Sequence, residues 1–357
     1  MDLDTISCGN SDNLDLTDDI NNVRYKNIQR SMDLDTISFG DIDSLDITDD
    51  ANNQPEIALN ISEETDHEVD IEKQLKYGAD PDTIVNWTVG KTALMLATEK
   101  GWFKTCKLLI EYGANVNAHE QDKKTALHFA VALNRFEIVR LLLQHSANHS
   151  ARDEKKDTPL KMAVTLGYAE ITSELLAKGA NVNTLDRFHT SPLFTAASCG
   201  HVEVASILLH NGAEVDTCDG ENCTALLEAT NKGFINMVEL LCNNKANVNA
   251  VNDDGNSALH FAAIRERSEI IKLLIKEGAN CNIVSKDGKT PLHIAAFYGN
   301  LEIVSILLNN GAAQDLKDHE DKTPYRIAIE KGHLTVAEAI EGYTKELKHC
   351  LNFCRCC

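Results

Sequence analysis

Three histidines have the side-chain chemistry of metal ligands or general acid–base groups: His128, His260 and His293. They are 132 and 33 residues apart along the chain, and the first interval is four times the second. This spacing indicates one histidine in each of several equivalent units, so the three side chains are not expected to converge on one metal or substrate. No Ser-His-Asp or Cys-His arrangement can be argued from the sequence either. We therefore predict that the protein is not an enzyme.

Two Gly-Lys-Thr triplets, Gly90–Thr92 and Gly288–Thr290, resemble the end of a phosphate-binding loop. The full motif has a glycine five residues before its Gly-Lys pair. Those positions hold Val85 and Ile283. We therefore predict no nucleotide site and no other cofactor.

The carboxyl end is rich in cysteine, with four of the last eight residues: Cys350, Cys354, Cys356 and Cys357. Three interpretations stay open: exposed reduced thiols, lipidation of Cys356 and Cys357, and a soft-metal site with His349. A terminal Cys-Cys pair looks like a lipidation signal, although the residues before it do not have the C-a-a-X form. No second ligand cluster with zinc-finger spacing is present, so we assign no metal ligands.

The other cysteines are scattered, which is typical of free thiols in a reducing compartment. Cys218 and Cys223 lie in one predicted loop without a partner pair. We expect both to be free thiols.

A hydroxyl residue recurs every 33 residues without slippage, and it begins eight similar units: Thr92, Thr125, Thr158, Ser191, Thr224, Ser257, Thr290 and Thr323. In the clearest unit, Thr290 is a good N-cap and Pro291 suits the first helical position. Gly299 then ends a first helix, and a second apolar helix follows up to Gly311. Two such short helices cannot close a core alone, so we predict that the units stack.

The period and the phrase TPLHIA resemble the ankyrin repeat family. The resemblance covers residues 86–349 and implies an all-α solenoid of stacked helix-turn-helix units with projecting β-hairpin loops. It also implies that the three histidines make structural hydrogen bonds to the neighbouring loop. Residues 63–85 contain a half repeat with polar residues at core positions, which predicts an N-terminal cap, and the eighth unit is predicted to cap the other end. Residues 350–357 form the cysteine-rich tail.

Residues 1–62 have a different composition. MDLDTIS occurs at Met1 and again at Met32, so the segment contains a 31-residue duplication, and residues 1–60 hold 14 acidic and 3 basic side chains. Such a segment cannot bury enough apolar surface to offset the entropy lost on ordering, so we expect disorder. A solvating tail and a short linear binding motif both remain open. The spacing of the acidic residues does not fit a calcium-binding EF-hand.

The net charge of −21 argues against a nucleic-acid-binding surface, which needs clustered Lys and Arg. The sequence contains no run of about 20 apolar residues, so it predicts no membrane span. The acidic N-terminus lacks the apolar stretch of a secretory signal. We expect a cytoplasmic monomer.

The resemblance implies that partners bind a concave face formed by the first helices and the loops. Large apolar side chains and arginines are informative at positions that the repeat leaves free. They fall in two groups, one in units two to four and one in units six and seven: Leu133, Leu166, Arg187 and Phe188, then Ile264, Arg265, Phe297 and Tyr298. For each leucine, packing between first helices is an equal alternative.

The predicted function is a non-catalytic adaptor or scaffold that binds a partner protein on this face. A membrane-tethered scaffold, anchored by lipidated C-terminal cysteines, is the alternative. The resemblance also implies that asparagines in the closing phrase of a unit are substrates of asparaginyl hydroxylation; here these are Asn117, Asn183 and Asn249.

Overall fold

The computed structural model describes residues 59, 68–86 and 88–343. The predicted disorder of residues 1–62 therefore falls outside the described residues, apart from Leu59. The cysteine-rich tail, residues 350–357, lies outside them entirely.

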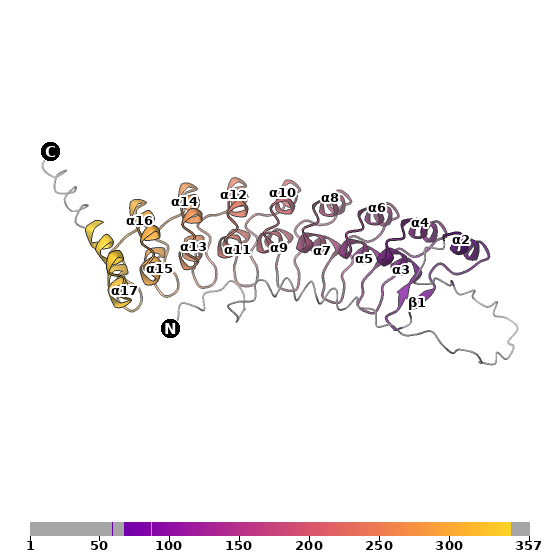
Figure 1. Cartoon of the computed structure of the whole chain (residues 1–357), viewed down its shortest axis with the longest axis horizontal. Helices are drawn as coiled ribbons and strands as arrows, with labels where there is room; N and C mark the ends of the chain where they lie inside the picture. Colours follow the sequence, from indigo (N-terminus) through magenta and orange to yellow (C-terminus); the bar gives the residue numbers. More distant parts are fainter. Residues whose placement is uncertain (1–58, 60–67, 87, 344–357) are drawn as a thin grey trace. The chain divides into compact units, whose positions relative to one another are not determined.

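The array consists of helix pairs that stack in two layers, as Figure 1 shows. The layer of first helices comprises α3 (Ala93–Lys100), α5 (Ala126–Ala132), α7 (Pro159–Leu166), α9 (Pro192–Cys199), α11 (Ala225–Lys232), α13 (Ala258–Ile264), α15 (Pro291–Tyr298) and α17 (Pro324–Glu330). The layer of second helices comprises α2 (Glu68–Lys76), α4 (Phe103–Glu111), α6 (Phe136–Gln144), α8 (Ala169–Ala177), α10 (Val202–His210), α12 (Ile235–Asn243), α14 (Ser268–Lys276) and α16 (Leu301–Asn309). Residues 334–343 are also helical and follow α17.

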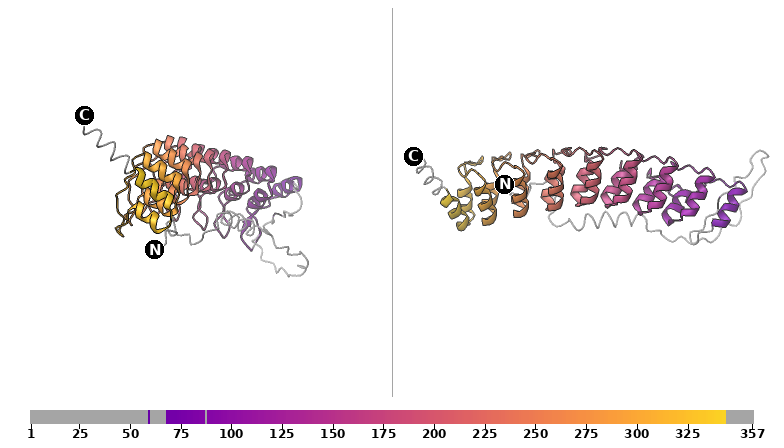
Figure 2. Two further views of the ribbon diagram at one scale, coloured as in Figure 1. Left: turned by 60° about the vertical axis from the view of Figure 1, so that its left-hand side comes forward. Right: turned by 90° about the horizontal axis from the view of Figure 1, so that it is seen from above.

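Each helix packs on its partner and on the equivalent helices before and after it. The left view of Figure 2 shows the two layers from another direction, and the right view shows the row of helix pairs from above. This arrangement confirms the predicted all-α solenoid, because the main contacts among the described helices lie within one unit or between adjacent units.

The first helices begin where the capping residues predict. In α15, Thr290 is extended (φ −94°, ψ 167°) and its side chain accepts a hydrogen bond from the backbone of His293. Pro291 takes the first helical position, where a missing N–H does no harm. The same cap, with Thr or Ser, precedes the first helix of every unit. Each first helix makes about two helical turns before the chain reverses into the second helix.

A left-handed residue makes that turn. Gly299 has φ 75°, and a Cβ on it would lie 2.4 Å from the His333 ring of the next unit. Glycine is thus required both by the backbone conformation and by the close approach of this side chain. In the second and sixth units, Asn134 and Glu266 adopt the same conformation without glycine (φ 54° and 55°).

The core lies between the two layers and is built from Ala, Leu, Ile and Val, as the composition suggests. Leu292, Ala295 and Leu307 are fully buried within one unit. The last unit differs, because no further first helix covers α17 within the described part of the chain. Tyr325 and Ile329 are exposed at that end of the array.

The loops before the first helices carry less strand than the sequence predicts. We number them as fingers 1 to 8, each named after the unit whose capping residue it precedes. Finger 1 is a two-stranded antiparallel hairpin, β1 (Ile84–Asn86) with β2 (Lys91–Thr92). Fingers 2, 5 and 6 have single bridges, such as Cys218 to Thr224. The arms are too short for a longer ladder, and turns form most of each finger.

Candidate functional site

The buried histidines are part of the scaffold. Nδ1 of His260 accepts the backbone N–H of Ser257 (3.1 Å), and its Nε2 bonds the carbonyl oxygen of Lys289 in the next unit (3.0 Å). His128 and His293 are bonded in the same way. In each, Nδ1 accepts the backbone N–H of the capping threonine, and Nε2 bonds a carbonyl oxygen of the next unit, that of Asp157 for His128 and that of Lys322 for His293. These bonds are those that the resemblance implied.

Burial lowers the pKa of all three histidines, and that of His260 falls to about 4. They are therefore neutral structural donors at physiological pH, with no open face for a substrate. Among the residues that the structure describes, no group of three or more His, Cys, Asp or Glu side chains could hold a metal ion. None of the described helices is both long enough and apolar enough to cross a membrane.

The second predicted group of contact residues lies at the ends of two neighbouring helices, α13 and α15. The rings of Phe297 and Tyr298 meet edge to face, with centroids 5.1 Å apart. The Lys331 ammonium lies 4.0 Å from the centroid of the Phe297 ring. Ile264 occupies the position equivalent to Phe297 in the adjacent unit, and all three apolar side chains are half-buried.

Arg265 belongs to the same surface and is exposed. Its Nε donates to Oδ1 of Asn231 in the preceding unit, at 3.1 Å. The contact restrains the guanidinium and leaves its other donors available to a partner.

The first predicted group does not form one patch. Leu133 and Leu166 lie at the C-terminal ends of α5 and α7, where both are half-buried. Phe188 lies in finger 4, before the N-terminal end of α9. Because the first helices stack in the same orientation, the C-terminal ends of α5 and α7 and the finger before α9 are at opposite edges of the layer.

Phe188 is the most exposed aromatic side chain described on the fingers, with 55% of its surface accessible. The Arg187 guanidinium lies 4.4 Å from its ring centroid. Such stacking restrains both side chains before a partner arrives, so less entropy is lost on binding. An exposed, ordered Phe–Arg pair has the composition of an interface hot spot.

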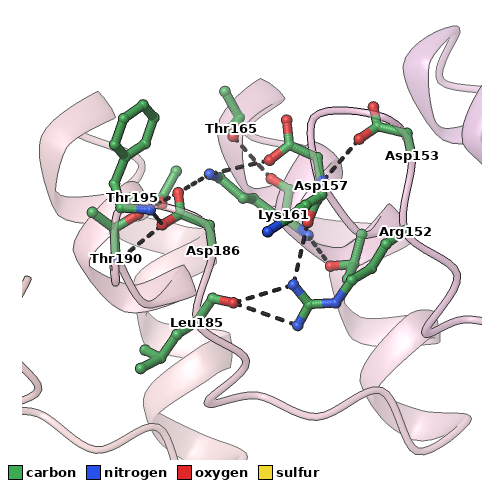
Figure 3. Close-up of polar contacts among 12 residues, drawn as sticks. Arg152, Asp153, Asp157, Lys161, Thr165, Leu185, Asp186, Thr190 and Thr195 are labelled. Atoms are coloured by element: carbon green, nitrogen blue, oxygen red, sulfur yellow. Dashed lines mark hydrogen bonds and ion pairs between the residues drawn. The ribbon is translucent and has the colours of Figure 1, made fainter. Parts of the chain in front are cut away.

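Asp186 holds this finger in place, as Figure 3 shows. Its Oδ1 accepts the backbone N–H groups of Phe188 (2.7 Å) and Thr190 (2.9 Å), and its Oδ2 accepts the Thr190 hydroxyl (2.7 Å). It also pairs with the Lys161 ammonium of α7, which bonds Asp157 as well (3.2 Å). Burial alone would raise the pKa of Asp186, but the hydrogen bonds from Lys161 and Thr190 outweigh burial and lower it.

Finger 4 differs from the other fingers in its backbone contacts. Adjacent fingertips are joined by one N–H···O=C bond at five places: Gln121 to Val89, Glu154 to Asp122, Asp253 to Glu221, Lys286 to Asp254, and His319 to Asp287. Within the described part of the chain, no such bond joins finger 4 to finger 3 or to finger 5. Arg152 of finger 3 instead reaches the carbonyl oxygen of Leu185 at 3.5 Å.

One row of exposed apolar residues was missed by the sequence reasoning. Leu185, Val251 and Val284 are 37%, 42% and 50% exposed, and each precedes its capping residue by six positions. Cys218 holds the same position in finger 5 and is partly exposed. Comparing the residue at this position in every unit would have revealed the row. The exposed Phe103, Ile235, Leu301 and Leu334 instead share a position at the start of second helices.

The asparagines of the closing phrases link neighbouring units. Asn249 Nδ2 donates to Gly278 O (3.4 Å), and its Oδ1 accepts the N–H of Asn280 (2.7 Å). Asn117 and Asn183 make equivalent pairs of bonds. Their hydroxylation stays a prediction.

The cysteines agree only in part with the sequence reasoning. Cys218 is a free thiol, as are Cys242 and Cys281. The prediction for Cys223 is wrong, because this residue is disulfide-bonded. Cys356 and Cys357 lie outside the described residues, so their lipidation stays a prediction.

A family model described as ankyrin repeats (three copies) matches residues 62–153, 146–219, 211–285 and 265–346. These matches together cover the whole described array. A comparison with curated proteins finds no match for the chain.

Proposed function

This chain belongs to the ankyrin-repeat family, whose repeats serve as protein–protein interaction modules, and we propose that the array binds a partner protein across its fingers and first helices. The observation that carries the proposal is Phe188, an aromatic side chain that is more than half exposed on a finger held by Asp186. A large apolar group held in water is stabilised when a partner covers it.

A second contact area supports an extended partner. The Phe297–Tyr298 pair with Arg265 lies at the ends of first helices two and three units beyond finger 4. Aromatic and arginine side chains dominate the binding energy of most interfaces. A partner that reaches both areas would cross the first-helix layer from its finger edge to its opposite edge.

The proposed role is that of an adaptor without chemistry of its own. The histidines with shifted pKa are fully engaged in hydrogen bonds between units. The ordered polar contacts near Phe188, through Asp186 and Lys161, hold a loop and leave no acid–base pair facing an open cleft. The alternative of a membrane-tethered scaffold draws no support from the described residues.

The test combines Phe188→Asp with Tyr298→Asp. We expect the double variant to lose its partner in quantitative proximity labelling while its helical circular dichroism and melting stay those of the wild type. The single variant Phe188→Asp controls for a folding defect. The Phe188 side chain is exposed and stacks on Arg187 at the surface, so replacing it should leave the fold intact.

Phe103→Asp is the matched control. Phe103 is also an exposed aromatic, at 40%, but it begins the second helix α4 on the other layer. Unchanged labelling of partners by the double variant would show that the proposed surface is wrong. An equal loss of partner labelling with Phe103→Asp would instead indicate non-specific binding to exposed aromatic residues.

A further inference from the structure

Fingers 2 to 4 carry a group of cations that the acidic composition of the chain does not suggest. We define the basic finger surface as four exposed residues: Lys123, Lys155, Lys156 and Arg187. None of the four is paired with a carboxylate within the part of the chain that the structure describes. Their charges therefore remain available to a ligand.

Two of these lysines occupy a left-handed turn position. Lys123 and Lys156 have φ 60° and 64°, the left-handed conformation of the fingertip turn. The same turn position in fingers 6 and 7 holds glycine. A lysine here adopts a conformation that L-residues seldom take, so the scaffold does not favour it.

The sign of the fingertip charge changes along the array. In fingers 5 to 8, the residue three positions before the cap is acidic: Glu221, Asp254, Asp287 and Glu320. The equivalent residue is Lys155 in finger 3 and Phe188 in finger 4, while finger 2 has Asp122 there, followed by Lys123 and Lys124. Fingers 2 to 4 thus hold the four exposed cations of the basic finger surface next to the exposed aromatic ring, whereas the exposed Lys286 and Lys317 of fingers 7 and 8 lie beside acidic tips.

Of the six acidic residues on fingers 2 to 4, two are exposed, because Glu120 and Asp153 are buried and the partly buried Asp157 and Asp186 pair with Lys161. Asp122 already pairs with Lys124, at 3.3 Å. Glu154 is exposed at the tip of finger 3, beside two lysines. The six basic and six acidic residues of these fingers balance in number, but five of the cations and only two of the carboxylates are exposed.

We propose that the basic finger surface binds an acidic segment of the partner protein, with an apolar side chain of that segment against Phe188. This inference rests on the proposed function and specifies the chemistry of the partner. Carboxylates in the segment would meet the unpaired lysines and Arg187, whose guanidinium can hold a carboxylate by two parallel bonds. The apolar contact adds burial that the charges alone do not provide.

The acidic fingers beyond finger 4 orient this segment. Like charges facing across an interface are unfavourable and suppress the wrong register. An acidic segment that slid towards fingers 5 to 8 would face Glu221 and Asp254. A nucleic-acid backbone is disfavoured for the same reason, since it would meet these carboxylates along the row.

The test measures binding of a fluorescent peptide to the full-length protein by anisotropy. The peptide has six Asp or Glu residues around one Leu, and its two comparison probes are an Asp/Glu-to-Lys version and a single-stranded oligonucleotide of equal charge. We expect the acidic peptide to bind most tightly. Its affinity should fall as salt rises, because exposed charges are screened.

Lys155→Glu with Lys156→Glu should weaken acidic-peptide binding about tenfold, equivalent to about 1.4 kcal/mol. The matched control is Lys178→Glu with Lys276→Glu, which changes the net charge equally at exposed positions on the second-helix side. The control should change the affinity less than about twofold, within ordinary rim effects. Phe188→Ala should weaken the Leu-containing peptide but not a version with Gly in place of Leu.

Two outcomes separate this inference from the proposed function. If Phe188→Asp abolishes partner labelling but the acidic peptide binds no better than its lysine version, the partner chemistry is wrong and the binding role stands. If the peptide binds as expected but partner labelling survives Phe188→Asp with Tyr298→Asp, the proposed function fails. Equal or tighter binding of the oligonucleotide, with the same loss in the Lys155–Lys156 variant, would overturn the assignment to an acidic protein segment.

Discussion

Acid should loosen the array through its buried histidines, and His260 allows the effect to be calculated. Burial lowers its pKa from the ordinary 6.5 to about 4. In the folded chain the neutral ring donates from Nε2 to Lys289 O and accepts the Ser257 N–H at Nδ1. Protonation would add a charge in a site that is fully buried.

The sign follows from proton linkage. The unfolded chain takes up a proton near pH 6.5, whereas the folded chain resists it until about pH 4. The stability that neutral His260 provides is therefore complete above pH 6.5 and is lost as the pH falls towards 4. Each pKa unit corresponds to 1.36 kcal/mol, so the loss is about 2 kcal/mol at pH 5 and about 3 kcal/mol at pH 4.

His260→Gln tests this reasoning, because glutamine at the third helical position can also reach the cap N–H but does not titrate. Stability should be measured by amide hydrogen exchange of peptides covering residues 257–276, since a long array unfolds in segments. Between pH 7.5 and 5, the wild type should lose about 2 kcal/mol more than the variant. Most carboxylates stay ionised over this range.

His145→Gln, at the exposed end of α6, controls for the loss of a histidine as such. Equal losses in the wild type and in His260→Gln would refute the linkage argument. They would mean that the ring takes up a proton in the folded state as readily as in the unfolded one.

Three further substitutions test the scaffold by hydrogen exchange and urea denaturation. Asp186→Asn should destabilise finger 4 locally by about 2 kcal/mol, because it removes charge-assisted bonds to Lys161 and to the finger backbone; unchanged exchange of residues 185–190 contradicts this. Gly299→Ala should cost more than Gly311→Ala, since both glycines are left-handed but only Gly299 faces a neighbouring ring, and the excess should be at least about 1 kcal/mol. Equal urea midpoints for the two variants would contradict the packing argument. Asn249→Ala should cost about 1 kcal/mol through its two bonds to the next unit, measured from the urea midpoint; no shift would show that water replaces them.

The scaffold could be predicted from sequence because its determinants are local. Thr290, Pro291 and Gly299 specify the start and end of one helix within ten residues. The regular interval between equivalent residues then predicts stacking. The role of His260 needed the family resemblance, because its acceptor Lys289 O is 29 residues away and belongs to another unit.

The surface was less predictable because exposure depends on what the neighbouring units place beside each residue. Leu133 and Leu166 occupy free positions in the repeat, yet the stack half-buries both. The pairing of Lys161 with Asp186 spans 25 residues and exists only when unit 3 lies against finger 4. Phe188 was found because its residue type is unusual at a fingertip, whereas the row through Leu185 and Val251 looked like ordinary strand residues.

Finger 4 shows how an array can vary one surface without disturbing its scaffold. The other central fingertips are tied to a neighbour through backbone bonds, so a change in one tip shifts the next. Finger 4 lacks those bonds; like Asp219 and Asp318 in fingers 5 and 8, Asp186 holds its finger from within, and it also ties finger 4 to α7 through Lys161. The side chain that holds finger 4 is Asp186. The tip residues Arg187 and Phe188 take no part in these contacts except through the backbone N–H of Phe188. Substitutions at the tip can therefore change what the finger binds at little cost in stability, which is the property that a partner-specific contact requires.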